Sequence, residues 1–333
     1  MTDALERARV AVDAFAAKAV PDDRTIVCDL AVKADGDDVA VTGTVSTHDI
    51  ARRLFEHLRA FPAVDREASS VRVLEAIWTE ATVSVVAAPV RAAPNGESEQ
   101  ITKILYGDQV DAADTDGDWR RIAAPDGYLG WVNSSVLTHS ETSRADAVLC
   151  ENVPVSGGAA EGLAPEYLPT GTPCTVLEEG EQTTVCFRTG LKQSVHRDAL
   201  SNPDENALPD GDAIVDIARQ YLGTTYEWGG MTTDGIDCSG LVWVSYRIFG
   251  MNLPRDADQQ REVGQPVERE ELRAGDLLFF PGHVAISLGG KRYIHAHGDS
   301  GGVVESSLDP DADDYIESLD EGLACCRRLL PTP

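Results

Sequence analysis

The 333-residue sequence lacks long hydrophobic runs and contains few aromatic residues. No stretch reaches the ~18 apolar residues that a membrane-spanning helix needs, and the first residues lack the basic segment and apolar core of a secretory signal peptide. We therefore expect a cytoplasmic protein without a membrane span. Aromatic residues make up 6% of the chain, but the apolar content of 42% is ordinary for a folded protein and argues against disorder.

Basic residues are scarce: 28 Lys and Arg stand against 56 Asp and Glu, which gives a formal net charge of -28. A chain this acidic lacks the basic surface that nucleic-acid binding requires, so we expect no nucleic-acid partner. The acidic residues are dispersed along the sequence instead of forming one tail. Such an excess suits a halophilic protein, because multimolar salt screens charge repulsion within a few ångströms. The alternative is an ordinary acidic cytosolic protein.

The seven cysteines are odd in number and include no Cys-x-x-Cys pair. The sequence therefore indicates neither a disulfide framework nor a zinc site. At least one thiol stands alone, and we expect most of the others to be buried as small hydrophobic residues.

Hydrophobic patterns divide the chain into four parts of an α+β protein. Residues 1–77 predict a small α+β module that faintly resembles BON domains. Residues 78–140 carry short strands separated by turns and resemble a bacterial SH3-like barrel, and residues 141–205 predict a second, divergent barrel. Residues 201–211 are rich in turn formers and acidic residues, which marks a linker. The last part, residues 206–333, begins with a helix that Asp212 caps and Gly223 ends.

Cys238 is a candidate nucleophile because a second helix is expected to begin after Asp237 and to end at Gly250. A cysteine in the first turn of a helix lies near unpaired backbone N–H groups and the positive end of the dipole, which stabilise a thiolate. The same N–H groups can hold an oxyanion during acyl transfer. Taken alone, a cysteine at such a position is more often structural.

Two histidines on successive predicted strands, residues 283–288 and 291–295, favour the catalytic interpretation. A hairpin through Gly289 and Gly290 with an odd-length loop would bring His283 and His295 to the same side of the sheet. A two-residue loop would put them on opposite sides.

Six short motifs in the last part together resemble the NlpC/P60 peptidases. They are residues 226–230 (Tyr-Glu-Trp-Gly-Gly), 237–242 (Asp-Cys-Ser-Gly-Leu-Val), 253–256 (Leu-Pro-Arg-Asp), 275–280 (Gly-Asp-Leu-Leu-Phe-Phe), 283–286 (His-Val-Ala-Ile) and 294–296 (Ile-His-Ala). With the two barrels, the chain resembles the γ-D-glutamyl-L-diamino acid endopeptidases that carry two SH3 domains, including the cytosolic peptide-recycling ones. Residues 1–75 lie outside this resemblance.

The resemblance implies a papain-like fold and a cysteine peptidase that needs no metal or cofactor. Cys238 would be the nucleophile, His283 the base that takes its proton, and His295 the polar residue that orients His283. His297, two residues after His295, is the alternative for the third role.

The resemblance also assigns six positions to substrate binding: Tyr226, Asp237, Ser239, Asp256, Asp108 and Tyr128. Tyr226 would lie by the oxyanion site. In the recycling enzymes the first SH3 domain recognises the free amine of a short peptide, and Asp108 and Tyr128 match its acidic and tyrosine positions. A carboxylate forms a charge-assisted bond with an ammonium group and so rejects blocked peptides.

The sequence departs from the family pattern at Ala285 and Ser287, where glycine and tyrosine are common, and at Ala257, where a hydroxyl residue is frequent. These departures leave substrate preference open. We expect a cysteine endopeptidase that hydrolyses γ-D-glutamyl-L-diamino acid bonds in small cell-wall-derived peptides with a free N-terminal amine, or in a related isopeptide. The alternatives are an amidase or acyltransferase on the same Cys-His-His site, and a non-catalytic peptide- or envelope-binding protein.

Overall fold

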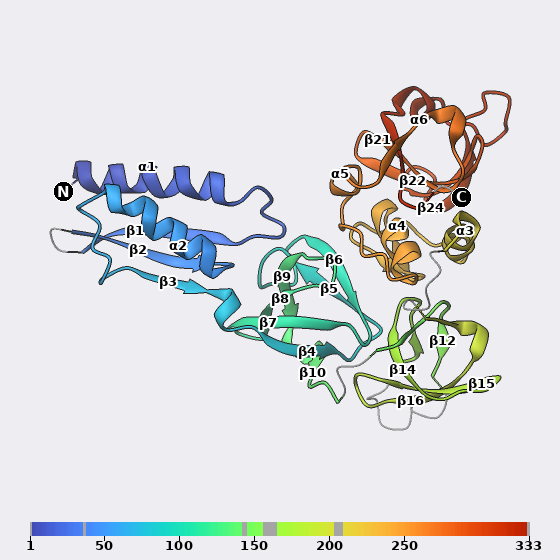
Figure 1. Cartoon of the computed structure of the whole chain (residues 1–333), viewed down its shortest axis with the longest axis horizontal. Helices are drawn as coiled ribbons and strands as arrows, with labels where there is room; N and C mark the ends of the chain where they lie inside the picture. The colour runs from blue at the N-terminus through green and yellow to red at the C-terminus, as the bar shows by residue number, and fades with distance from the viewer. Residues whose placement is uncertain (1, 36–37, 142–144, 156–164, 203–208, 332–333) are drawn as a thin grey trace.

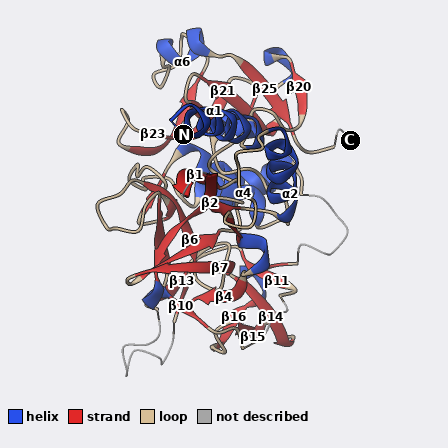
Figure 2. Cartoon of the chain, turned by 90° about the vertical axis from the view of Figure 1, so that its left-hand side faces the viewer, coloured by secondary structure: helices blue, strands red, loops and turns tan. Residues whose placement is uncertain are grey.

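The computed structural model describes residues 2–35, 38–141, 145–155, 165–202 and 209–331. Four sheet-bearing units follow one another along the chain, with the N-terminal unit at one end and the first barrel between it and the other two (Figure 1). The α-helices belong to the N-terminal and C-terminal units, whereas the barrels are built from strands (Figure 2). Residues 203–208 of the predicted linker lie outside the described residues.

The N-terminal unit packs two helices on a three-stranded sheet. Its elements are α1 (Thr2–Ala19), β1 (Cys28–Asp35), β2 (Asp38–Val45), α2 (His48–His57) and β3 (Ser70–Val73). Strand β2 pairs antiparallel with β1 and parallel with β3. Val12, Val41 and Leu54 are buried in the core between the helices and the sheet, as the helical and alternating patterns predicted. The resemblance to BON domains stays a prediction.

The first barrel is a seven-stranded antiparallel sheet in the order β10-β4-β7-β8-β9-β5-β6. Its strands are β4 (Thr79–Val83), β5 (Ala87–Arg91), β6 (Gln100–Leu105), β7 (Gln109–Asp116), β8 (Trp119–Ala123), β9 (Leu129–Asn133) and β10 (Leu137–Thr138). The sequence analysis missed β5, whose short apolar run is interrupted by Pro89. Buried Val83, Val90 and Ile122 form part of the barrel core.

The second barrel has its own core, which takes in one residue of the first barrel. Its main sheet has the order β16-β15-β14-β11-β17, and a separate pair joins β12 to β13. Tyr106 of the first barrel packs with Leu149, Val185 and Phe187 in this core. The strands are β11 (Ala147–Leu149), β12 (Val153–Pro154), β13 (Tyr167–Leu168), β14 (Pro173–Glu178), β15 (Gln182–Phe187), β16 (Lys192–His196) and β17 (Leu200–Ser201).

The C-terminal unit packs helices on a six-stranded sheet in the order β20-β25-β21-β22-β23-β24. Its helices are α3 (Gly211–Arg219), α4 (Cys238–Arg247), α5 (Ala257–Gln260) and α6 (Glu317–Gly322). Its strands include a short hairpin, β18 (Met231–Thr232) and β19 (Gly235–Ile236), besides the main sheet of β20 (Gln265–Val267), β21 (Ala274–Phe280), β22 (His283–Gly289), β23 (Arg292–His297), β24 (Gly302–Ser307) and β25 (Cys325–Arg328). The buried side chains of Ile214, Trp243 and Ile286 join α3, α4 and the sheet in one core.

The start of α3 differs from the prediction. Asp210, and not Asp212, is the N-cap, because the side chain of Asp210 accepts a hydrogen bond from the backbone N–H of Ala213 at 2.9 Å. The helix ends at Arg219, before Gly223, whose φ of 80° places it in the left-handed region. Within the part of the chain that the structure describes, no helix has the length and apolarity to cross a bilayer.

Candidate active site

Asp237 fixes the start of α4 and thereby the position of Cys238. Its Oδ1 atom accepts the backbone N–H of Gly240 at 2.6 Å, and its Oδ2 atom accepts the N–H of Gly229 at 2.7 Å. A Cβ atom at Gly240 would meet the carbonyl oxygen of Gly230 at 2.3 Å, so the helix packs directly on this loop. Cys238 is the first residue of the helix, as the sequence predicted, and it is 7% exposed.

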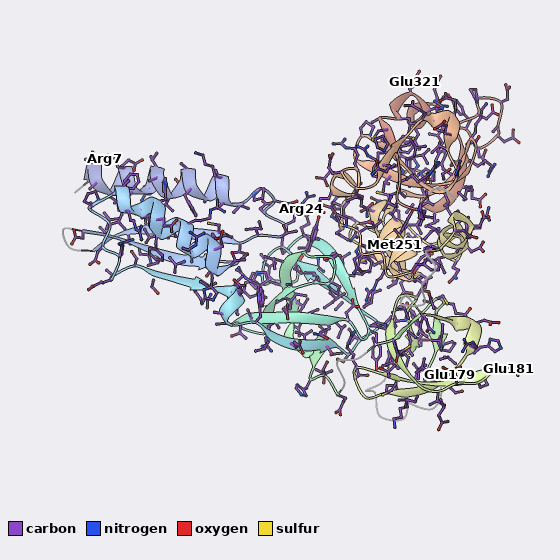
Figure 3. The ribbon with its side chains drawn as sticks, viewed as in Figure 1. Arg7, Arg24, Glu179, Glu181, Met251 and Glu321 are labelled. Carbon is purple, nitrogen blue, oxygen red and sulfur yellow. The ribbon has the colours of Figure 1, made fainter. Side chains whose placement is uncertain are left out.

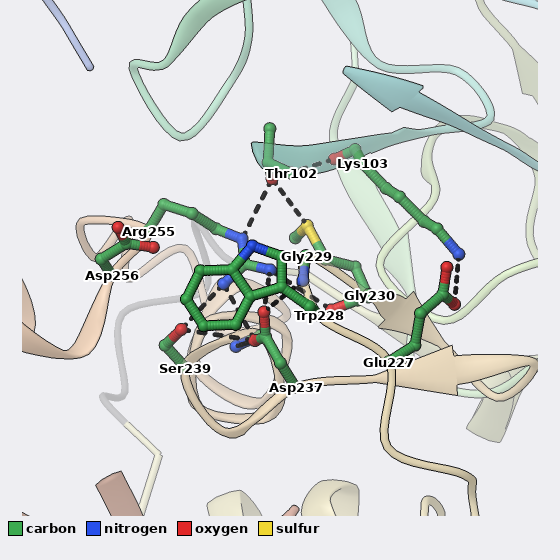
Figure 4. Close-up of polar contacts among 12 residues, drawn as sticks. Thr102, Lys103, Glu227, Trp228, Gly229, Gly230, Asp237, Ser239, Arg255 and Asp256 are labelled. Atoms are coloured by element: carbon green, nitrogen blue, oxygen red, sulfur yellow. Dashed lines mark hydrogen bonds and ion pairs between the residues drawn. The ribbon is translucent and has the colours of Figure 1, made fainter. Parts of the chain in front are cut away.

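Arg255 connects this helix start to the first barrel and is the main residue that the sequence analysis missed. Its side chain is fully buried and forms a bidentate ion pair with Asp237, at 2.8 Å and 3.0 Å (Figure 4). The guanidinium also donates to Ser239 Oγ at 2.8 Å and to Thr102 Oγ1 of β6 at 3.0 Å. Its only signal in the sequence was its place in the motif of residues 253–256.

Asp237 and Ser239 lie beside Cys238 but are buried and hydrogen-bonded within the protein. A buried carboxylate that is paired with a guanidinium costs several kcal/mol to unpair. The structure therefore uses these predicted substrate-binding residues to hold the first turn of α4. Tyr226 packs against the core cluster that contains Cys238. Burial first, and then the electrostatic effect of the Cys238 sulfur, raise the pKa of Tyr226.

The hairpin between β22 and β23 brings the two histidines to one side of the sheet through a bulge. Its turn leaves two residues, 290 and 291, between the paired Gly289 and Arg292. Such a loop alone would put His283 and His295 on opposite sides. The register, however, shifts between Ser287 and Gly289, and this extra residue restores the alternation.

His283 and His295 form a hydrogen-bonded pair. The Nε2 atom of His283 lies 2.8 Å from Nδ1 of His295, and Nε2 of His295 lies 3.2 Å from Oγ of buried Ser306 on β24. These bonds leave Nδ1 of His283 for the proton of Cys238, whose sulfur accepts a hydrogen bond from the backbone N–H of Val284. Ser306 was missed because its pairing with β23 depends on a register that the sequence does not reveal.

His297, the alternative third residue, is placed differently. Its ring stacks on that of His295 at a centroid distance of 5.0 Å, and its Nδ1 atom lies 3.0 Å from Ser300 Oγ. His295 is thus the histidine that bonds His283. Among the described residues, no group of three or more His, Cys, Asp or Glu side chains is arranged to hold a metal ion.

Burial is the main cause of the pKa shifts of Cys238, His283 and His295 in the protein without substrate. It raises the pKa of Cys238 to about 12, and the nearby carboxylate of Asp237 adds to this effect. Burial lowers the pKa of His283 to about 4, with a further contribution from His297, and it lowers the pKa of His295 to about 2. A backbone hydrogen bond at the helix start lowers the pKa of Cys238, as expected, but burial outweighs it. Both groups are neutral in the free protein near pH 7, because neither charged form is hydrated at its buried position.

The first barrel borders the site on one side. Lys103 pairs with Glu227 at 2.6 Å (Figure 4). Gln100 Nε2 donates to the carbonyl of Trp228 at 2.7 Å. The hydroxyl of Tyr128 lies 3.5 Å from Gln259 Oε1 in α5. Burial first, and then a hydrogen bond to the carboxylate of Asp256, raise the pKa of Tyr128. Tyr128 and Asp256 are thus brought together.

Asp108 does not lie with Tyr128 and Asp256. Its buried carboxylate accepts the N–H of Leu105 at 2.8 Å and pairs with Arg247, in the last turn of α4. Cys238 is the first residue of this ten-residue helix and Arg247 is the last, so their backbones lie about one helix length, ~14 Å, apart. The acid next to Tyr128 is Asp126, which accepts the N–H of Tyr128 at 3.0 Å.

Comparison with known proteins places the chain in a family. The model of the NlpC/P60 family matches residues 223–316, and that of the bacterial SH3 domain matches residues 86–138. The probable endopeptidase NlpC of Escherichia coli (strain K12) is 42% identical over 120 residues, which cover 32% of this chain and 77% of that protein. The chain belongs to the NlpC/P60 family. The predicted α+β class with an NlpC/P60 domain and a bacterial SH3 domain is thereby confirmed, and so is the prediction of a cysteine peptidase.

This NlpC/P60 protein is also similar to relatives over a larger part of its own length. The gamma-D-glutamyl-L-lysine dipeptidyl-peptidase of Bacillus subtilis (strain 168) is 28% identical over 218 residues, covering 59% of this chain and 71% of the relative. The crystal structure of an NlpC/P60 family protein from Bacillus cereus ATCC 10987 matches with a TM-score of 0.66 at 22% sequence identity. The match covers 76% of this chain and 100% of the other chain, and it shows that the two share a fold. Three other curated relatives are matched over 55%, 65% and 66% of their own length.

Proposed function

We propose that the protein hydrolyses the γ-D-glutamyl-L-diamino acid bond of small cell-wall-derived peptides that carry a free N-terminal amine. The observation that carries the proposal is the 2.8 Å bond between His283 and His295, which leaves one ring nitrogen of His283 to serve Cys238. The similarity to a gamma-D-glutamyl-L-lysine dipeptidyl-peptidase supports this substrate class.

In the first half of the reaction, Nδ1 of His283 takes the thiol proton while the Cys238 sulfur attacks the γ-carbonyl carbon. Backbone N–H groups in the first turn of α4 stabilise the oxyanion. Collapse breaks the C–N bond, and His283 returns the proton to the leaving amine. A thioester remains on Cys238.

In the second half, His283 takes a proton from water, whose oxygen attacks the thioester carbon. The C–S bond breaks, the thiol is regenerated and the γ-carboxylate leaves. The Nδ1 atom of His295 accepts a hydrogen bond from Nε2–H of His283 throughout and stabilises the imidazolium, while Nε2–H of His295 donates to Ser306.

Tyr128 and Asp256 are the groups that we assign to the free amine of the substrate. Asp256 follows Arg255, which holds the helix of Cys238, and the Asp256 side chain is 29% exposed. A carboxylate accessible from solvent can pair with an ammonium group, whereas an acetylated amine would leave it without this charge-assisted bond.

The test is mass spectrometry of L-Ala-γ-D-Glu-diaminopimelate incubated with the wild type and with Cys238→Ala, in dilute buffer and in multimolar salt. Release of L-Ala-γ-D-Glu by the wild type alone is the expected result. Turnover by Cys238→Ala, or no cleavage by a folded and reduced wild type in either salt, would overturn the proposal.

We further propose that the protein works in a reducing and salt-rich cytoplasm. All seven cysteines are free thiols, which suits a reducing compartment. The net charge of -28 suits high salt. Cell fractionation and the dependence of folding on salt test these two statements separately.

A further inference from the structure

The loop between α1 and β1 of the N-terminal unit reaches Tyr128 and Asp256, the groups that we assign to the substrate amine. The backbone carbonyl of Arg24 accepts the N–H of Leu129 in the first barrel at 2.8 Å. Gln259 of α5 donates to Asp22 Oδ2 at 2.6 Å. Arg24 thus lies where the N-terminal unit, the first barrel and the C-terminal unit meet (Figure 3).

The guanidinium of Arg24 is saturated by three carboxylates. It donates to Asp256 at 2.7 Å, to both oxygens of Asp258 at 2.9 Å, and to Asp22 at 2.9 Å and 2.8 Å. These five bonds use all the N–H donors of an arginine side chain. Hydrogen bonding to Arg24 lowers the pKa of Asp22 to about 2 and also lowers the pKa of Asp258.

Arg24 therefore contacts the same two groups that the proposed function gives to the substrate amine. Besides its bond to Asp256, its guanidinium carbon lies 5.9 Å from the ring centroid of Tyr128. The Arg24 side chain is 30% exposed, so the contact lies at the solvent edge, where a peptide can enter. A guanidinium and an ammonium cannot both approach one carboxylate oxygen without repelling each other.

We infer that Arg24 is a specificity-determining residue that competes with the substrate amine for Asp256. This inference rests on the proposed function and adds a role for the N-terminal unit. Arg24 can yield to a substrate because it gives up one of five hydrogen bonds and keeps Asp22 and Asp258. The competition therefore weakens the binding of free-amine peptides without blocking it, and it leaves N-blocked peptides unaffected.

The test compares Arg24→Gln with the wild type on L-Ala-γ-D-Glu-diaminopimelate and on its N-acetyl derivative. Loss of the competing cation should lower KM for the free-amine peptide about three- to tenfold, with kcat unchanged. KM for the acetyl peptide should stay the same. Asp258→Asn removes one of the two carboxylates that hold Arg24 when it yields, so it should raise KM for the free-amine peptide, and in the Arg24→Gln background it should have little effect.

Arg52→Gln is the matched control, because Arg52 is an exposed arginine of the same unit that pairs with Asp49 and Glu56. It should leave both KM values unchanged. An unchanged or higher KM of Arg24→Gln for the free-amine peptide, in a protein with wild-type melting temperature, would overturn the inference while leaving the proposed function intact. Failure of both the wild type and Arg24→Gln to cleave either peptide would instead overturn the proposed function, and this inference with it.

Discussion

The Nε2 atom of His283 and the Nδ1 atom of His295 lie 2.8 Å apart, so one of the two rings donates a hydrogen bond to the other. For His283 to accept a proton at Nδ1, its Nε2 must carry hydrogen and donate to His295. His295 must then carry its own hydrogen at Nε2, where Ser306 Oγ lies 3.2 Å away. The active form of the base thus fits a single chain of hydrogen bonds that runs through His295 to Ser306.

We expect His295→Ala to lower kcat about 100-fold, because His283 loses the group that holds its orientation and tautomer. His295→Gln, which retains an acceptor, should recover part of this loss. The measurement is steady-state kinetics on the tripeptide. A kcat within a factor of two of wild type for His295→Ala would contradict the relay, and His297→Ala under the same conditions tests whether the neighbouring ring takes over.

Ser306→Ala should lower kcat about three- to tenfold, since one neutral hydrogen bond to His295 is lost. Ser306→Thr keeps the hydroxyl and should preserve the rate if the methyl group fits. Ser306 touches neither Cys238 nor His283 in the relay that we describe, so KM should not change. A change in KM with constant kcat would point to a purely structural role.

The acid limb of the pH profile should lie near pH 4. Because burial lowers the pKa of His283 to about 4, the base is protonated and inactive only below that value. The kcat/KM should therefore rise between about pH 3 and 5 and then stay level through neutral pH, with the Cys238 pKa near 12 above the tested range. His297→Gln removes a nearby positive charge at low pH and should shift the limb to higher pH. A limb near the ordinary histidine pKa in the wild type would contradict this assignment.

Arg255→Ala should lower the free energy of unfolding by about 3–5 kcal/mol, because it leaves the buried carboxylate of Asp237 without its partner. Thr102→Val removes one bond to the same guanidinium and should cost about 1–2 kcal/mol. Denaturant unfolding measures both values. Exposed Arg52→Ala is the control, expected to change stability by less than about 1 kcal/mol, and an equally small effect of Arg255→Ala would refute the buried ion pair.

Asp256→Asn should reduce discrimination between free-amine and acetylated peptides, whereas Asp108→Asn should leave that discrimination unchanged. Asp108 pairs with Arg247 at the far end of α4, so its loss should appear as a lower melting temperature. The ratio of kcat/KM for the two peptides separates the effects. If Asp108→Asn altered the ratio as strongly as Asp256→Asn, the original sequence-based assignment of Asp108 would be restored.

The sequence by itself determined what depends on neighbours along the chain. Asp237 caps the helix of Cys238 through Gly240, three residues away, and such local bonding is encoded in a few adjacent residues. The motifs around Cys238, His283 and His295 likewise identified the family.

Only the tertiary structure decided the contacts between distant segments. Arg24 and Asp256 are 232 residues apart in the chain, and no local pattern predicts their ion pair. The bulge between Ser287 and Gly289, which puts His283 and His295 on one side, and the pairing that brings Ser306 to His295 depend on strand register. The neutral state of Cys238 is likewise a property of the packed molecule, since its pKa depends on how completely the fold removes water from the sulfur.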